Sequence, residues 1–167
     1  GSDDNLTAVV VRCVEGEQRS TVEDALASIP LFQHFSPRER SRLAPFLEVA
    51  PHDPGATLCG EGDPGDSIYI LLEGECEVSR RGRRLTTLKA PLQFGEIALV
   101  RGTPRTATVR ALTHVRLLIL HRDPINSLLQ RQPRLGAGLM MQLCRTLADR
   151  VVDLTEQLAA PRLPAKD

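Results

Sequence analysis

One acidic and one basic residue stand close together in an otherwise small and apolar stretch, FGEIALVRGTPRTATV, which covers residues 94–109. Glu96 precedes Arg105 by nine residues. Gly95 and the residues after it can make a single helical turn, whose first N–H groups have no partner within the helix and therefore attract an anion. Arg105 follows the turn-forming residues 102–104, so its guanidinium can fold back over the same place and hold two phosphate oxygens together.

The carboxylate of Glu96 has a different partner in this interpretation. Directly beside the phosphate it would repel the ligand, but one group further away it accepts hydrogen bonds from a sugar hydroxyl. The spacing of Glu96 and Arg105 therefore predicts a compact sugar phosphate as the ligand. The alternative is a surface ion pair between the two residues, which is common and contributes little to stability.

The composition indicates what kind of protein positions these residues. A chain of 167 residues with 41% hydrophobic residues is one ordinary domain with enough apolar surface for a core. Its 21 Lys and Arg balance 21 Asp and Glu, so no overall field attracts nucleic acid or an anionic membrane, and an anion site must be local. No segment approaches the roughly 20 apolar residues of a membrane span, and no signal-peptide core follows the N-terminus. We expect a soluble, cytoplasmic protein without a nucleic-acid or membrane partner.

The four cysteines, Cys13, Cys59, Cys76 and Cys144, are far apart in the sequence. Metal and redox sites need paired, short cysteine spacings, and none is present here. These thiols are therefore predicted to be small buried hydrophobic residues, and no metal site is expected. A reducing cytoplasm is the compartment that this pattern favours.

Residues 49–120 have the pattern of a β core. Short apolar runs are separated there by glycine and proline, at the spacing typical of antiparallel sandwiches and jelly rolls. Cys76 and Val78 alternate with polar residues, and so do alternate positions of 106–111, as in half-buried strands. The arginine-rich segment 80–84 has a central glycine and is predicted to be an exposed hairpin tip, because a nucleic-acid patch would need aromatic neighbours for stacking.

Helices are predicted before this core. Residues 21–29 have a helical composition. Ser36, Pro37 and Glu39 form an N-terminal capping pattern, in which a serine cap is followed by a proline at the first helical position and a glutamate three residues on. We expect a helix from Pro37 to about Leu47.

Two more helices are predicted after the core. Asp123-Pro124 has the same cap-then-proline order, and Pro133 starts a last helix that reaches about residue 158. An apolar stripe runs along one face of this last helix and must cover something; it consists of Leu135, Leu139, Leu143, Leu147, Val151, Leu154 and Leu158. Residues 161–167 have no apolar face and are predicted to be a tail.

These motifs carry a family resemblance, because FGEIALVRGTPRTATV resembles the phosphate-binding cassette of the cyclic nucleotide-binding domain. That family includes regulatory subunits of cyclic-AMP-dependent protein kinase, cyclic-nucleotide-gated channels and the bacterial catabolite activator. The upstream segment EGDPGDSIYILLEGECEV resembles further landmarks of the family, at Gly65, Asp66, Tyr69 and Gly74. The resemblance covers about residues 31–158. For residues 21–160 it implies an α+β, mainly β fold: an eight-stranded antiparallel β-roll (jelly roll) with N-terminal helices and two C-terminal helices.

The resemblance also implies roles for the residues of the cassette. Glu96 takes the ribose 2′-hydroxyl, Arg105 pairs with the cyclic phosphate, and Thr106 reaches the phosphate or the base. Backbone N–H groups complete the phosphate cradle, and a glycine lets the ligand approach closely. The implied contact residues are Gly95, Glu96, Ile97, Ala98, Arg105, Thr106 and Ala107. The implied ligand is cyclic AMP (cAMP) or cyclic GMP (cGMP), with cAMP favoured, and neither a cofactor nor a catalytic residue is implied.

Members of this family use the last helix as a lid over the ligand. This implies that Leu143 or Leu147 caps the base, with Leu85 and Leu88 as the opposite wall of the pocket. Two alternatives remain open for the leucines of the helix. One is plain core packing, and the other is a homodimer seam, because the second half of the apolar stripe also follows the four-three step of a heptad.

The first residues carry a second, shorter resemblance. Asp4-Asn5 and the apolar run 6–11 resemble the last strand of metal-dependent serine/threonine protein phosphatases, in which that aspartate is a metal ligand. Asp4 would then be a metal ligand in the full-length protein, and residues 1–20 a remnant strand plus linker. The alternative is a simple N-terminal strand or tail. This resemblance implies a regulatory domain that acts in cis on an upstream phosphatase and has no phosphatase activity of its own, since one aspartate cannot hold two metals.

Two other effector domains remain as alternatives. A transcription factor of the catabolite-activator type needs a helix-turn-helix after the last helix, and residues 159–167 do not supply one. A cyclic-nucleotide-gated channel needs a membrane segment upstream. The sequence preceding Gly1 would discriminate among the three.

Overall fold

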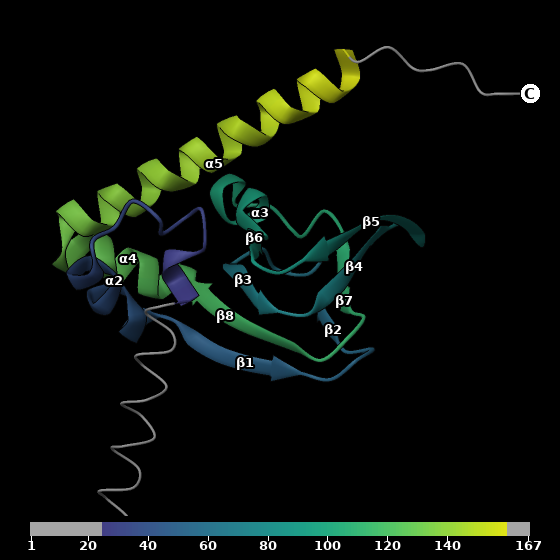
Figure 1. Cartoon of the computed structure of the whole chain (residues 1–167), viewed down its shortest axis with the longest axis horizontal. Coiled ribbons are helices and arrows are strands. Elements are labelled where there is room, and N and C mark those ends of the chain that lie inside the picture. The colour runs from purple at the N-terminus through teal and green to yellow at the C-terminus, as the bar shows by residue number, and fades with distance from the viewer. Residues whose placement is uncertain (1–24, 160–167) are drawn as a thin grey trace, which may run out of the picture.

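Two four-stranded antiparallel sheets form the centre of the molecule (Figure 1). The computed structural model describes residues 25–159. The strands are β1 (Glu48–His52), β2 (Thr57–Cys59), β3 (Ser67–Glu73), β4 (Glu75–Arg80), β5 (Arg83–Lys89), β6 (Leu92–Phe94), β7 (Thr108–Ala111) and β8 (Val115–His121). One sheet has the order β1-β8-β3-β6 and the other β2-β7-β4-β5. The predicted eight-stranded antiparallel β-roll is therefore confirmed.

Four α-helices lie wholly within the described residues and surround the sheets: α2 (Pro37–Leu43), α3 (Glu96–Arg101), α4 (Arg122–Arg131) and α5 (Pro133–Ala159). A 3₁₀ turn (Ala44–Phe46) follows α2. Figure 1 shows α2, α4 and the beginning of α5 together at one end of the sheets, while α5 runs on past α3. The helices after the β core, α4 and α5, are the two predicted C-terminal helices.

The predicted cap of α2 is confirmed, but its predicted end is wrong. Ser36 and Glu39 form a capping box, in which the Ser36 side chain accepts from the Glu39 N–H and the Glu39 carboxylate accepts from the Ser36 N–H. The α-helix ends at Leu43 instead of about Leu47, because Pro45 has no N–H and cannot continue the α-helical hydrogen bonding. The prediction for α4 is also wrong by a few residues, since its N-cap is His121 and Asp123 lies in the first turn.

The core has two parts, one on each face of the first sheet. Ile68 and Ile70 of β3 pair with Leu120 and Leu118 of β8, and these four side chains pack against the helices. Leu71 and Leu117 belong to the second part, which lies between the two sheets. Strands β3 and β8 are thus covered on both faces, which is why their sequences read as continuous apolar runs.

The apolar stripe of α5 is covered along only part of its length. Leu135, Leu139 and Leu143 are buried in the core, whereas Val151 and Leu154 are exposed and Leu158 is 83% exposed. A helix of 27 residues is about 40 Å long, which exceeds what the β-roll covers. The first half of the stripe therefore packs on this chain, and the second half has no cover within the described residues.

The hairpin predicted at residues 80–84 is confirmed. It joins β4 to β5 through Arg81 and Gly82, both at positive φ (49° and 72°), as a two-residue hairpin turn requires. The prediction of four buried cysteines is wrong for Cys144, which is exposed, while Cys59 and Cys76 are buried. Several predicted features lie outside the described residues: Cys13, Asp4 with the strand 6–11, the first part of the helix 21–29, and the tail 161–167.

Candidate functional site

A cavity of about 220 Å³ opens between the second sheet, α3 and α5, and it contains most of the residues that the sequence singled out. The residues that line it are Cys59, Val78, Thr86, Leu88, Phe94, Gly95, Glu96, Ile97, Ala98, Arg105, Thr106, Ala107, Val109 and Arg150. All seven predicted contact residues from 95 to 107 are among them. One segment of the chain thus supplies one end of the cavity.

Arg105 is 5% exposed and has no ion-pair partner among residues 25–159. Its Nη1 donates to the carbonyl oxygens of Ser67 and Gly95 at 2.9 and 3.0 Å, and its Nη2 donates to Ser67 Oγ at 2.8 Å. The buried Nε has no partner in this part of the chain. Since Nε and Nη2 share one edge of the planar guanidinium, that edge keeps donors for two oxygens of an anion.

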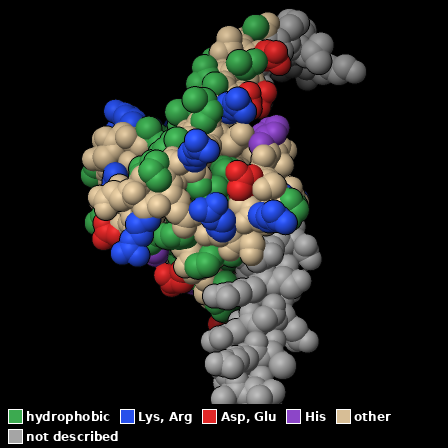
Figure 2. Space-filling model, turned by 90° about the vertical axis from the view of Figure 1, so that its left-hand side faces the viewer, with side chains coloured by type: hydrophobic (Ala, Val, Ile, Leu, Met, Phe, Trp, Pro, Cys, Tyr) green, Lys and Arg blue, Asp and Glu red, His purple; other side chains and the backbone are tan. Residues whose placement is uncertain are grey.

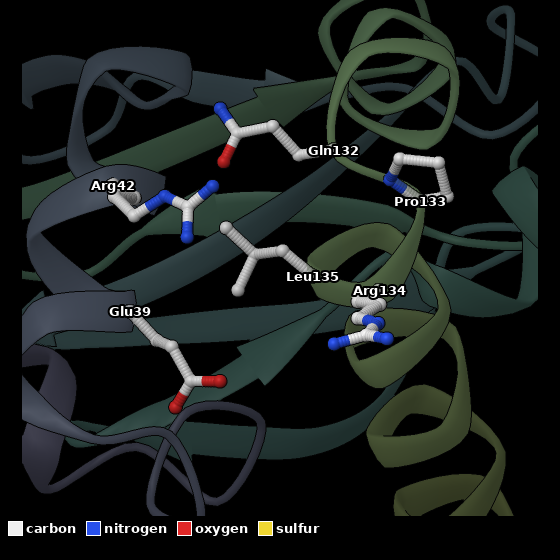
Figure 3. Close-up of a pocket in the computed structure, with 6 residues that line it drawn as sticks. All are labelled: Glu39, Arg42, Gln132, Pro133, Arg134 and Leu135. Carbon is white, nitrogen blue, oxygen red and sulfur yellow. The ribbon is translucent and has the colours of Figure 1, made fainter.

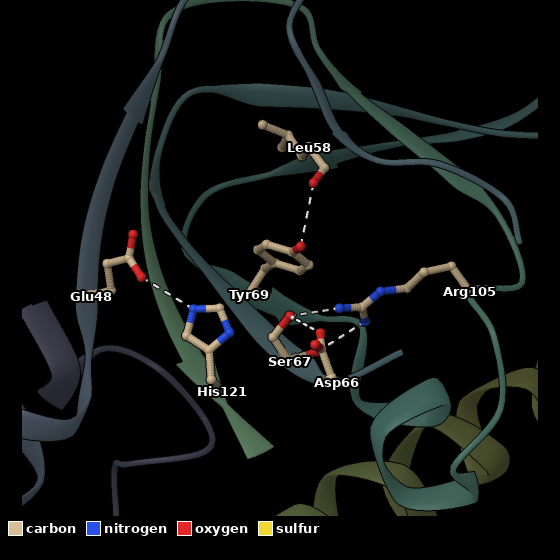
Figure 4. A network of polar contacts seen from close by, with 7 residues as sticks. All are labelled: Glu48, Leu58, Asp66, Ser67, Tyr69, Arg105 and His121. Atoms are coloured by element: carbon tan, nitrogen blue, oxygen red, sulfur yellow. Dashed lines mark hydrogen bonds and ion pairs between the residues drawn. The ribbon is translucent and has the colours of Figure 1, made fainter. Parts of the chain in front are cut away.

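The aromatic ring of Tyr69 packs against the guanidinium of Arg105. The Arg105 Cζ atom lies 5.0 Å from the centre of the Tyr69 ring, which stacks in turn on Phe94 at 5.1 Å between ring centroids. Figure 4 shows Tyr69 held through its hydroxyl, which donates to the Leu58 carbonyl oxygen at 3.3 Å. Cation–π contact and three hydrogen bonds fix the orientation of Arg105 before any ligand binds.

The Arg105 guanidinium lies so close to the backbone of Gly95 that this position requires a glycine. Its φ of +87° is in the left-handed region, and a Cβ at this position would lie 2.7 Å from Arg105 Nη1. Any other residue would strain the backbone and push the guanidinium away. Gly95 is also the N-cap of α3 and makes no side-chain cap, so it leaves the first N–H groups of that helix accessible from the cavity.

Glu96, the first residue of α3, is 1% exposed and forms an ion pair with Arg150 of α5. Arg150 Nη1 donates to Glu96 Oε1, and its Nη2 donates to the Gln93 carbonyl oxygen at 2.5 Å. The second carboxylate oxygen, Oε2, is buried and accepts no hydrogen bond from a described residue. A buried carboxylate oxygen without a donor is costly, so this atom is poised to accept a hydrogen bond from a ligand.

Arg150 was missed by the sequence analysis. It is the only residue of α5 that lines the cavity, and burial lowers the pKa of its guanidinium. The available signal was weak: a charged residue three positions after Leu147, beside the apolar stripe. Its partner Glu96 lies 54 residues earlier, and no local pattern links the two.

Helix α3 is held at its other end by Arg122, the first residue of α4. Arg122 Nη2 donates to the carbonyl oxygens of Leu99 and Gly65 at 2.9 and 3.2 Å. Arginines from α4 and α5 therefore bind both ends of α3, the helix that carries Glu96. Gly65 leaves room for this arrangement, because a Cβ there would lie 2.4 Å from Ala98 Cβ.

The opposite wall of the cavity consists of Val78, Thr86 and Leu88 on β4 and β5. Leu85 does not line it and is 59% exposed, contrary to the prediction. The reason is the period of a strand: Leu85 and Leu88 are three residues apart and therefore point to opposite faces of the sheet. Thr86 and Leu88 share the inner face, next to Val78 and Cys76 in the paired strand.

The leucines predicted as a lid are not in the cavity either. Leu143 is 1% exposed within the core that also contains Leu139, and Leu147 is half-buried outside the cavity lining. Leu143 lies two turns and Leu147 one turn before Arg150, the residue of α5 that pairs with Glu96 of α3. In this arrangement Arg150 takes the place expected for a leucine.

Neither a metal site nor a membrane span occurs in the described part of the chain. Residues 25–159 contain no group of three or more His, Cys, Asp or Glu side chains arranged to hold a metal ion. None of the helices described there is long and apolar enough to cross a membrane. Asp4, the predicted metal ligand of the full-length protein, lies outside the described residues.

Comparisons with protein-family models and with known proteins agree on one family. The family model for the cyclic nucleotide-binding domain matches residues 51–132, which include the whole segment from Gly95 to Ala107. The cAMP-dependent protein kinase regulatory subunit of Colletotrichum orbiculare is 38% identical over 67% of this chain. The CRP-like cAMP-activated global transcriptional regulator of Mycobacterium tuberculosis is 31% identical over 75% of it.

The chain spans 29% of the length of the Colletotrichum relative and 58% of the mycobacterial one. Among solved structures, a cyclic nucleotide-binding domain from Methylobacillus flagellatus superposes with a TM-score of 0.75 over 90% of this chain and 88% of its own length. At 24% identity, that likeness concerns the fold alone.

Proposed function

Because this chain belongs to the cyclic nucleotide-binding domain family, we propose that its cavity binds cAMP in preference to cGMP, and that binding is coupled to movement of α5. One observation carries the proposal. Two buried groups of opposite charge line the same cavity, and each has a buried hydrogen-bonding atom without a partner among the described residues, Nε of Arg105 and Oε2 of Glu96. The first needs an acceptor and the second a donor, and a ribose cyclic phosphate supplies both.

The phosphate belongs at Arg105. Burying an arginine without a carboxylate partner is unfavourable unless a bound anion compensates its positive charge. The free edge of its guanidinium suits two phosphate oxygens, and Ile97, Ala98 and Ala107, whose backbone N–H groups are further donors in this proposal, line the same cavity. This set of donors is the one that the family resemblance implies.

The ribose belongs at Glu96. Its Oε2 atom accepts the 2′-hydroxyl in this proposal, while Oε1 is bound to Arg150. A carboxylate that has lost its water but keeps one free oxygen discriminates strongly between a ligand with the hydroxyl and one without it, because the second leaves the oxygen unpaired.

Coupling to α5 follows from the position of Arg150. The cavity of about 220 Å³ is smaller than the roughly 300–1,000 Å³ of typical ligand pockets, and Arg150 is part of its lining. A bound nucleotide therefore has to reorient Arg150 while the ion pair with Glu96 is kept, and Arg150 sits on the continuous helix α5. The free energy of this rearrangement links ligand binding to the position of α5.

The preference for cAMP rests on the relatives, whose names describe them as cAMP-dependent and cAMP-activated. Thr106 lines the cavity and is exposed. It is therefore available to a phosphate oxygen or to the exocyclic amine of a syn guanine. Thr106 is the residue at which the preference for cAMP over cGMP is to be tested.

The proposed effector is a metal-dependent protein phosphatase, because Asp4-Asn5 resembles the end of that family's domain. On this proposal the domain regulates an upstream phosphatase in cis, and the chain itself hydrolyses neither phosphopeptide nor cyclic nucleotide in the presence of Mn²⁺ or Mg²⁺. Turnover that survives further purification would contradict this. The mycobacterial relative is a transcriptional regulator, which keeps a DNA-binding effector as the alternative, and a channel is the other.

A homodimer through α5 is a second proposal. Val151, Leu154 and Leu158 are exposed on one face at the four-three step of a heptad, and nothing in residues 25–159 covers them. A second copy of the same helix presents a complementary apolar seam. Dimerisation and nucleotide coupling are compatible, because Arg150 precedes the exposed part.

Calorimetric titration of the purified chain with cAMP tests the main proposal. Binding should be lost or greatly weakened in Arg105→Ala and retained in Arg110→Ala, which removes an exposed arginine on the neighbouring strand β7 that does not line the cavity. Absence of cAMP and cGMP binding by the folded wild-type chain would refute it.

A further inference from the structure

A second and larger hollow lies between α2 and the junction of α4 with α5. It has a volume of about 550 Å³, within the range of ligand pockets, and it is lined by Glu39, Arg42, Gln132, Pro133, Arg134 and Leu135 (Figure 3). None of these residues lines the cavity that contains Arg105. The hollow is therefore a separate feature that the proposed nucleotide site does not use.

The rim of this hollow is positively charged. Figure 3 shows Arg42 of α2 and Arg134 of α5 on opposite sides of Leu135. Both arginines are exposed, and neither forms an ion pair with a carboxylate of residues 25–159. Two separated cations with an apolar group between them call for a ligand with two separated anions and an apolar centre.

The one acidic residue of the rim is already engaged. Oε2 of Glu39 accepts from the N–H of Ser36 at 2.8 Å and from its hydroxyl at 2.7 Å, as part of the cap of α2. These hydrogen bonds lower the pKa of the Glu39 carboxyl, so it stays ionised and bound to the cap. With two arginines and one carboxylate, the rim keeps a net positive charge.

Two residues at the floor of the hollow place further requirements on a ligand, one apolar and one polar. Leu135 is 5% exposed and offers an apolar surface. Gln132 Oε1 is buried and accepts no hydrogen bond from a described residue, so an occupant should bring an N–H donor to it. A peptide backbone provides such a donor, and a simple dicarboxylate does not.

We propose that this hollow binds an acidic peptide segment, with carboxylates at Arg42 and Arg134, an apolar side chain over Leu135 and a backbone N–H at Gln132 Oε1. Nucleic acid fits less well, because no aromatic residue lines the hollow for base stacking. A lipid surface also fits less well, since the site is concave.

The surrounding surface favours the same partner. Arg38 and Arg131 are exposed on α2 and at the end of α4, two of the helices that border the hollow. This face points toward the viewer in Figure 2, which shows blue basic side chains spread over it among apolar and some red acidic side chains. A basic face of this kind raises the rate at which an acidic segment meets the hollow.

Occupation of the hollow would also affect α5. Arg134 and Arg150 are 16 residues apart on this one helix, a rise of about 24 Å. A peptide that ties the first turn of α5 to α2 restrains the helix that delivers Arg150 to Glu96. This consequence depends on the proposed coupling of α5 to the nucleotide, whereas binding of the peptide does not.

Three pentapeptides test the proposal on the full 167-residue chain. Acetyl-Glu-Glu-Leu-Glu-Glu-amide should shift the backbone amide signals of Arg42, Arg134 and Leu135 in NMR titrations. The peptide with Gln in place of every Glu should not, and the one with Gly in place of Leu should bind several-fold more weakly. No shift at these residues with the first peptide, or equal shifts with the Gln peptide, would overturn the proposal.

Single arginine variants test whether the acidic peptide binds in this hollow. Arg42→Ala and Arg134→Ala should each weaken the first peptide about fivefold, the scale of one exposed charge pair. Arg38→Ala should change it much less, because Arg38 lies on the same helix but does not line the hollow. Equal losses in all three variants would mean diffuse charge attraction and would refute a defined site. Arg105→Ala should leave peptide binding intact, so a failure of the nucleotide proposal stays distinguishable.

Discussion

Glu96 and Arg150 form an ion pair across 54 residues that joins the first residue of α3 to the long C-terminal helix. The pair is asymmetric: Glu96 is almost fully buried, whereas the Arg150 side chain is 40% exposed. One oxygen of the carboxylate is bound to Arg150, and the other has no donor among the described residues. A ligand that supplies the missing donor thus acts on the contact that holds α5 against α3.

Replacing Arg105 should abolish most of the affinity for cAMP. Loss of a buried counter-charge costs about 2 to 5 kcal/mol of binding, so Arg105→Ala should weaken binding by roughly thirty-fold or more. Arg105→Lys keeps the charge without the two-pronged geometry and should fall between Ala and wild type. Calorimetry measures both, with Arg110→Ala as the control. Unchanged affinity in folded Arg105→Ala would mean that Arg105 has only a structural role.

Replacing Glu96 should remove the discrimination between ribose and deoxyribose. Wild-type protein should bind cAMP more tightly than 2′-deoxy-cAMP, because only the first satisfies Oε2 of Glu96. In Glu96→Ala both ligands should bind weakly and with similar affinity. A ribose preference that persists in this variant would assign the 2′-hydroxyl to another residue.

Nucleotide binding should slow hydrogen exchange in α5 from residue 139 onward. A helix whose side chain meets the ligand changes its opening free energy when the ligand binds. Mass-spectrometric exchange should show slower exchange in residues 139–158 with cAMP, and a smaller effect in Arg150→Ala. Protection confined to residues 94–107 in the wild type would show that α5 is a fixed core or dimer element.

Stability should fall at alkaline pH through Cys76. Burial raises the pKa of this thiol to about 11, from an ordinary value of 9.0. Between these values the unfolded chain has lost the proton that the folded chain keeps, so the free energy of unfolding falls as pH rises from about 9 to about 11. In Cys76→Ala, urea unfolding should show a shallower decline over this range. Cys144→Ala, at an exposed cysteine, should follow the wild type; equal slopes in all three proteins would contradict the assignment.

The exposed seam of α5 should mediate dimer formation. In light scattering the chain should have twice its monomer mass of 18.3 kDa. Val151→Glu combined with Leu154→Glu should return it to the monomer, because charges in the seam repel across a two-fold interface. Val152→Glu is the matched control, since Val152 is equally exposed but lies beside the seam. A monomeric wild type would exclude this interface.

The sequence by itself determined the elements and most of one end of the site. Local rules suffice for the capping box of α2, the proline that starts α5 and the hairpin turn at Arg81 and Gly82, because each involves residues within a few positions of one another. Residues 95–107 reach one cavity for the same reason, since they form one short helix and one turn.

Only the tertiary structure decided the rest, because it concerns contacts between distant segments. Ser67 and Tyr69 orient Arg105 from a strand 38 and 36 residues earlier in the chain. Arg150 reaches Glu96 because the packing of Leu135, Leu139 and Leu143 sets the angle at which α5 crosses the β-roll. Periodicity predicts which face of a helix is apolar, but it contains no information on the partner of that face or on the charged residue that the packing brings into a cavity.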